Sequence, residues 1–105
     1  MTYASLRASL KALCPNTYRW AAPHGLTRYI MIHRYGANAL RGDDVRLHSF
    51  PRVQIDVYTQ DEEDALPGQV CELLDEQGLD YEIVDELYDE DLALFRTILQ
   101  LEVLG

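Results

Sequence analysis

Histidine and cysteine are the side chains through which this 105-residue chain would perform acid–base, nucleophilic or metal chemistry. The three histidines, His24, His33 and His48, form neither an HxxxH nor an HExxH motif, which would place two imidazoles on one face of a helix. Cys14 and Cys71 lack CxxC spacing and fall on the apolar stripes of predicted helices, which favours buried thiols. We therefore predict no catalytic residue, no metal site and no cofactor.

Carboxylates are the other candidate ligands, and they gather in two runs, 61–64 and 85–91. Neither run has the spaced Asp/Asn, Gly and Glu pattern of a calcium-binding loop. The first run precedes a helical pattern, and the free N–H groups at a helix start favour negative charge. We interpret both runs as helix-start charge and solvated surface rather than as a cation site.

Basic and acidic residues are segregated along the chain. Residues 1–52 hold eight arginine and lysine residues against two aspartates, a net charge of +6, and residues 53–105 hold one arginine against sixteen carboxylates, a net charge of −15. The two halves can neutralise each other within one fold, or they can present opposite faces to neighbouring copies. The second arrangement favours head-to-tail contacts, which join two different surfaces of the same protomer.

Two helices are predicted from apolar residues at helical spacing. The first ends at Pro15, and the second begins at Asp61 or Asp64 and ends at Gly78. Pro67 fits the first turn of the second helix, where its missing N–H costs little. The two apolar stripes consist of Leu6, Leu10, Leu13 and Cys14, and of Leu66, Val70, Leu73 and Leu74.

Four strands are predicted, over 27–35, 52–58, 79–88 and 92–104, with 16–25 and 36–44 as loops and 89–91 as a turn. The second strand alternates, so that one face is expected to be buried and the other half-exposed. The last strand places Phe95, Thr97, Leu99, Leu101 and Val103 on one face, and Leu94 and Ile98 add apolar area to the other. The order α-β-β-α-β-β predicts an α+β fold, an antiparallel sheet with two helices packed on one face.

The length of the chain predicts a single domain over 1–105. No apolar run approaches the roughly 20 residues needed to cross a bilayer, and the N-terminal segment has no continuous apolar core of a signal peptide. We therefore expect a protein that acts in the cytoplasm and has no membrane partner.

Four segments together resemble a known family. The N-terminal helix with "TRYIMIHRYG", the "RVQIDVYT" strand followed by "QDEEDALPGQVCELLDEQG", and the closing "YDEDLALFRTILQLEV" are similar to the tail-terminator, or tail-completion, proteins of long-tailed bacteriophages, which include the minor tail protein U group. The resemblance covers nearly the whole chain but contains no invariant chemical motif. The Pro67–Gly68 pair departs from the smoother helix that the family pattern suggests.

The resemblance implies a structural virion protein with an α+β fold. Such proteins form a hexameric ring on the last ring of tail-tube protein, stop growth of the tube, and provide the surface to which the head-side connector docks. The implied partners are therefore other copies of the chain, the tail-tube protein and the connector, and the implied location is the tail or neck of a virion assembled in the host cytoplasm. DNA would pass through the ring without specific binding, since carboxylates repel phosphates.

Residues for these contacts are predicted from charge and exposed apolar character. The predicted subunit interface comprises Arg41, Arg46, Arg52, Asp61, Glu62, Glu63, Leu94 and Ile98. The predicted docking loop runs from Gly36 to Asp44 and includes Gly36, Ala37, Asn38, Ala39, Leu40, Gly42, Asp43 and Asp44.

Other functions fit the same sequence. A neighbouring neck or minor capsid component would share the strand pattern. An acidic inhibitor that mimics DNA phosphates would use the net charge of −9. A small enzyme would need a histidine and a carboxylate that meet only in the fold. A generic adaptor domain would need none of these features.

Overall fold

The computed structural model describes residues 1–35 and 52–103. The elements, in chain order, are α1 (Tyr3–Leu13), β1 (Thr17–Tyr18), β2 (Arg28–Tyr35), β3 (Arg52–Thr59), α2 (Leu66–Glu76), β4 (Tyr81–Asp89) and β5 (Leu94–Glu102). The structure confirms the predicted α+β class. It adds one strand, β1, that the sequence analysis had assigned to a loop.

The sheet is mixed rather than wholly antiparallel. Its strand order is β1-β2-β3-β5-β4, and only the short β1 runs parallel to its neighbour. A hydrogen bond holds β1 in place beside β2. The Thr17 hydroxyl donates to the Cys14 carbonyl over 2.6 Å and so keeps the chain against the end of α1. The Asn16 carbonyl then accepts from the Ile30 N–H over 2.9 Å. Pro23 and Gly25 lie beyond these contacts and do not prevent the pairing.

Helix α1 begins at a capping box and ends before a proline. The Thr2 hydroxyl accepts from the Ser5 N–H over 3.1 Å, and the Ser5 hydroxyl accepts from the Thr2 N–H over 3.0 Å. At the other end, Pro15 has no N–H to continue the helix. The buried face of α1 consists of Tyr3, Leu6 and Leu10.

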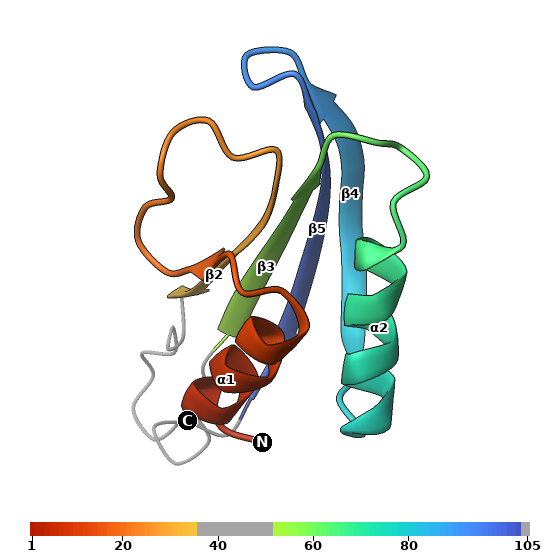
Figure 1. Ribbon diagram of the computed structural model, residues 1–105. Coiled ribbons are helices and arrows are strands. Elements are labelled where there is room, and N and C mark those ends of the chain that lie inside the picture. The colour runs from red at the N-terminus through yellow and green to blue at the C-terminus, as the bar shows by residue number, and fades with distance from the viewer. Residues whose placement is uncertain (36–51, 104–105) are drawn as a thin grey trace.

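Both helices pack on the same side of the sheet (Figure 1). The alternate residues of β3 that face them, Val53, Ile55 and Val57, are completely buried. They meet the α1 residues already named and the α2 residues Leu66, Val70 and Leu74 in one core. Each strand contributes every second residue to this core because side chains alternate across a sheet.

The other face of the sheet is partly covered as well, which corrects the half-exposed pattern predicted for β3. Tyr29 and Tyr58 stack with ring centroids 4.5 Å apart, and together with Leu94 they form a second buried cluster. Part of the loop before β2, including Ala22 and Leu26, packs on this cluster. Burial raises the pKa of both tyrosine hydroxyls.

Helix α2 starts later than predicted, because its cap position lies one residue after Asp64 and four residues after Asp61, the two predicted caps. Ala65 occupies the cap position and offers no side-chain bond, and Pro67 lies in the first turn as predicted. Asp64 replaces the missing cap, because its Oδ1 accepts from the Leu66 N–H over 2.9 Å. The same carboxylate receives the Arg28 guanidinium, with Nε to Oδ2 at 2.8 Å and Nη2 to Oδ1 at 3.0 Å.

The turn between β4 and β5 is longer than the predicted 89–91. Strand β4 continues to Asp89, and β5 begins only at Leu94. The Asp89 side chain accepts from the Leu92 N–H over 3.1 Å, and its carbonyl accepts from the Ala93 N–H over 2.8 Å. Ala93 has φ of 58°, a conformation that usually favours glycine.

Candidate interaction surfaces

The first surface is basic and lies over α1, β1 and β2. Residues 1–35 contain no aspartate or glutamate. Three guanidinium groups surround the Tyr3 ring, with centroid distances of 4.7 Å for Arg34, 5.1 Å for Arg19 and 5.9 Å for Arg7. We call Arg7, Lys11, Arg19 and Arg34 the basic surface. None of these four side chains forms an ion pair with a carboxylate in the described part of the chain.

A groove of about 570 Å³ runs along this surface between α1 and β1. Ala4, Ala8 and Ile32 give it apolar walls, and Arg7, Lys11 and Arg19 supply positive charge. The Arg19 Nε is buried and has no hydrogen-bond partner among the described residues. Beside it, the Trp20 ring lies 5.0 Å from the Arg19 guanidinium and is 81% exposed. We call this hollow the α1–β1 groove.

The second surface is acidic and follows the opposite edge of the sheet. Residues 72–91 hold ten carboxylates and no basic residue. Seven of these carboxylates lie in 80–91, which comprises β4 and its flanking turns. Strand β4 pairs only with β5 in the described structure, and Ile83 and Val84 are exposed on it. We call β4 with residues 80 and 90–91 the acidic edge.

Among the described residues, two ion pairs join the basic half of the chain to the acidic half. In the described structure, Arg28 pairs with Asp64, and Arg52 pairs with Glu102 over 3.4 Å. A third pair, Arg96 with Asp56, lies within the acidic half and is largely buried. The basic surface and the acidic edge are therefore not neutralised by each other, because β2, β3 and β5 separate them.

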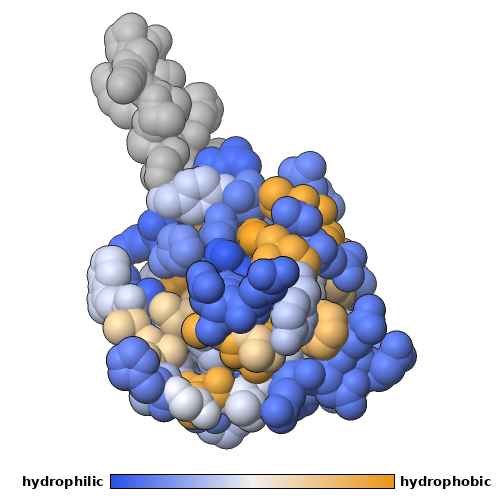
Figure 2. All heavy atoms as spheres, turned by 90° about the horizontal axis from the view of Figure 1, so that it is seen from above, coloured by the Kyte–Doolittle hydropathy of each residue, from blue (hydrophilic) through white to orange (hydrophobic). Residues whose placement is uncertain are grey.

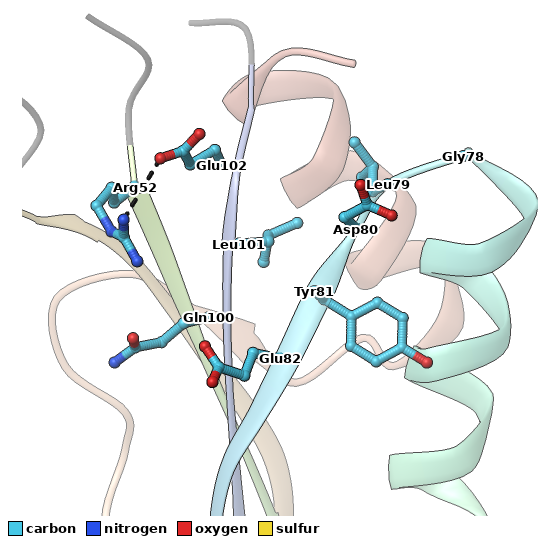
Figure 3. A pocket seen from close by; sticks show the side chains of 9 residues that line it. All are labelled: Arg52, Gly78, Leu79, Asp80, Tyr81, Glu82, Gln100, Leu101 and Glu102. Atoms are coloured by element: carbon cyan, nitrogen blue, oxygen red, sulfur yellow. Dashed lines mark hydrogen bonds and ion pairs between the residues drawn. The ribbon is translucent and has the colours of Figure 1, made fainter.

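Of the three arginines predicted at the subunit interface, Arg52 is the one that lies among the described residues. Its guanidinium and the Glu102 carboxylate lie at a hollow of about 520 Å³ between the start of β4 and the end of β5 (Figure 3). Asp80 and Glu82 contribute two further carboxylates to this hollow. Arg52 is thus already paired with a carboxylate of its own chain. Arg41, Arg46 and the whole predicted docking loop, 36–44, lie outside the described residues.

The predicted acidic interface residues are exposed in the turn after β3. The Asp61 Oδ1 accepts from the Glu63 N–H over 2.9 Å, so this carboxylate shapes the turn. Glu62 lines a hollow of about 400 Å³ that also contains Glu86 and Tyr88 of β4. The fold therefore brings Glu62 next to the acidic edge, which the sequence analysis did not foresee.

The two predicted apolar interface residues differ in exposure. Leu94 is 3% exposed because Tyr29 and Tyr58 of its own chain cover it, which leaves it little area for a neighbour. Ile98 is half-buried on the same face of β5. Seen from above, the surface is mainly hydrophilic, with hydrophobic residues in small patches (Figure 2).

Two of the three histidines lie among the described residues. His24 lies exposed in a loop and His33 lies on β2, and no ion pair joins either imidazole to a carboxylate in residues 1–35 and 52–103. No group of three potential metal ligands was found among the same residues. None of their helices has the length and apolar character to cross a membrane. Cys14 is buried, Cys71 is half-buried, and both are free thiols.

Sequence reasoning missed the residues that define the two surfaces. The predicted interface residues do not include Arg7, Lys11, Arg19 or Trp20, nor the carboxylates of β4. One signal was available, because the first 35 residues lack acid and residues 72–91 lack base. Their placement at opposite edges depends on the strand order, which no short motif encodes.

Comparisons of the chain with protein-family models, curated proteins and solved structures returned no match.

Proposed function

We propose that this protein is a structural assembly protein that associates head to tail with its own copies and caps a phage tail tube as a ring. In this role it stops tube growth and provides the surface for the head-side connector. The phage role rests on the resemblance of the four segments to tail terminators. The mode of association rests on the structure.

The observation that carries the proposal is the position of the unneutralised charge. The basic surface and the acidic edge lie at opposite edges of one sheet. A contact between unlike surfaces is heterologous, and repeated heterologous contacts close into a ring when the rotation between subunits allows it. Charge complementarity also sets the register of such contacts and discourages pairing of two acidic edges.

The acidic excess suits a ring around DNA. The chain has a formal net charge of −9 at pH 7. A lumen lined with carboxylates repels phosphates over about 8–10 Å at physiological salt, so that DNA passes without adhering. The proposed partners are the tail-tube protein on one side of the ring and the connector on the other.

Self-association tests the first part of the proposal. Sedimentation equilibrium of the wild-type chain is expected to show oligomers in 50 mM NaCl that weaken in 500 mM NaCl, because salt screens contacts between exposed charges. A lysine-reversal variant, Asp61→Lys with Glu62→Lys and Glu63→Lys, is expected to weaken association without changing circular dichroism. A chain that stays monomeric in low salt at 1 mM would refute head-to-tail association.

The tail role needs a separate assay. Phage tails assembled without this protein should be overlong when viewed by electron microscopy, since nothing would stop tube growth. Deletion of residues 36–44 should preserve the folded chain and abolish docking, and retained docking would exclude that loop. Tails of normal length would refute the terminator role and would leave a neck or minor capsid component as the alternative.

One observation favours a second candidate of a different class. The seven carboxylates of the acidic edge, with no basic residue among them, resemble the charge density of a phosphate backbone. An acidic DNA-mimic inhibitor would use this edge to occupy a nuclease or repressor as a monomer. Inhibition of purified nucleases, together with no self-association, would favour this function over assembly.

A further inference from the structure

We infer that the α1–β1 groove is the receiving site of the head-to-tail contact and that it takes the β4–β5 turn of a second copy. The turn comprises residues 90–93, with Glu90, Asp91 and Leu92 at its exposed tip. This inference rests on the proposed function and specifies which residues meet.

The groove has the chemistry of a receptor for a short acidic and apolar segment. Its volume of about 570 Å³ falls within the usual range for a bound small ligand, so it suits a turn rather than a domain. Arg7, Lys11 and Arg19 supply three positive charges without a neighbouring carboxylate in residues 1–35. The Arg19 guanidinium is held between the Tyr3 and Trp20 rings, at centroid distances of 5.1 and 5.0 Å, which orders this charge beside the groove.

The β4–β5 turn has the complementary chemistry. Glu90 and Asp91 are exposed and form no ion pair in the described structure, whereas the Asp89 carboxylate is held within the turn. Leu92 is about half exposed, which gives the tip one apolar side chain for the Ala4 and Ala8 wall. The hydrogen bonds to Asp89 fix the turn before it binds, which reduces the entropy lost on association.

A second copy must supply the turn, because the chain cannot fold it into its own groove. Strands β1 and β4 form opposite edges of the sheet, with three strands between them. At roughly 4.8 Å per strand spacing, β4 lies about 19 Å from β1. The contact is therefore heterologous, as a head-to-tail ring requires.

An exposed tryptophan beside an arginine is also typical of single-stranded nucleic acid binding, through stacking and phosphate contacts. The charge of the rest of the molecule argues against that ligand. The chain carries a net charge of −9, and this repels a polyanion, while a short acidic turn of another copy brings few charges. The observations therefore favour an acidic protein segment.

Charge reversal with rescue tests the inference. The groove variant carries Arg7→Glu and Lys11→Glu, and the turn variant carries Glu90→Lys and Asp91→Lys. Each variant alone is expected to associate at least about tenfold more weakly than wild type, because like charges then meet. A 1:1 mixture is expected to restore association, since each reversed surface finds a reversed partner. Lys11→Glu alone serves as the milder variant if the double groove variant does not fold.

Trp20 provides an independent readout, because it is the single tryptophan of the chain and lies beside the groove. A synthetic peptide of residues 86–95 is expected to change Trp20 fluorescence in the wild type and to lose this effect in the groove variant. A single-stranded oligonucleotide is expected to cause no change. A fluorescence change with the oligonucleotide but not with the peptide would overturn the inference.

A matched control separates this inference from the proposed function. Glu72→Lys with Glu76→Lys makes the same charge change on α2, away from the turn. If this control abolishes association and the turn variant does not, the head-to-tail contact stands but the turn is the wrong segment. If the 1:1 mixture of reversed variants stays monomeric while wild type associates, the pairing of groove and turn is refuted. If wild type itself stays monomeric, both proposals fail.

Discussion

Asp64 is expected to be the most important single carboxylate for the placement of α2. Its Oδ1 accepts from the Leu66 N–H at a helix start that has no other side-chain cap. Its two oxygens also bind Arg28 of β2, so one side chain joins α2 to the sheet. We expect Asp64→Ala to lose both interactions at once.

The expected loss of stability in Asp64→Ala is the sum of a helix-cap contribution and an ion-pair contribution. A side-chain cap contributes about 1 kcal/mol to helix stability. The Arg28 side chain is 47% exposed, so the ion pair is worth only about 0.5 kcal/mol despite its two-pronged geometry. Asp64→Ala should therefore destabilise the protein by about 1.5 kcal/mol, or lower Tm by roughly 6–10 °C for a domain of this size.

Three variants separate the two interactions. Arg28→Ala removes only the ion pair and should cost about 0.5 kcal/mol. Asp64→Ser keeps a cap and loses the charge, so it should resemble Arg28→Ala rather than Asp64→Ala. Urea unfolding followed by circular dichroism at 222 nm measures all three, and a double-mutant cycle gives the coupling between Arg28 and Asp64.

The pH dependence gives a second check on the same carboxylate. The hydrogen bond from Arg28 holds the pKa of Asp64 below its ordinary value, despite opposing desolvation. A carboxyl with a depressed folded pKa contributes stability that is complete above its unfolded pKa of about 3.9 and is lost as pH falls through the folded value. The stability difference between wild type and Asp64→Asn should therefore shrink below about pH 4. Equal costs for Asp64→Ala and Arg28→Ala would refute the capping role.

Three further predictions concern the core and the turn. Arg96→Met should destabilise the protein by about 3 kcal/mol in urea unfolding, because Asp56 is 4% exposed and would lose the positive charge that pairs with it. A loss of stability below about 1 kcal/mol would mean that water reaches the Asp56 carboxylate. Leu74→Ala should cost about 2–5 kcal/mol by the same assay, since Leu74 is fully buried between α2 and the sheet, and a near-neutral effect would contradict the core assignment. Ala93→Gly should raise stability by about 0.5 kcal/mol, because Ala93 has positive φ; a lower Tm would show that chain entropy outweighs this strain.

The elements were predictable where local pattern and burial agree. The stripe of Leu6 and Leu10, ended by Pro15, matches α1, and the alternation of Val53, Ile55 and Val57 matches the buried face of β3. Strand β1 was missed because two residues carry no periodicity. Its pairing depends on the Thr17 hydroxyl reaching the Cys14 carbonyl at the end of α1, which is a tertiary contact.

The candidate surfaces were only partly predictable. The sequence reveals that base precedes acid, because composition is independent of folding. Leu94 is buried beneath Tyr29 and Tyr58, so the cluster contains residues from three strands. A local sequence pattern cannot predict contacts between residues so far apart in the chain. Arg19 and Trp20 lie in a segment that the sequence presents only as a loop, and their significance depends on the groove beside α1.

Residue order and composition are enough to predict the α+β class, both helices, the four longer strands and the segregation of charge. The positions of the charges in space depend on how the elements pack. The order β1-β2-β3-β5-β4 places the basic N-terminal elements and the acidic β4 at opposite edges, and no ion pair joins the two within residues 1–35 and 52–103. Strand order is set by long-range packing, so the physical separation of the two charged surfaces exists only in the folded chain.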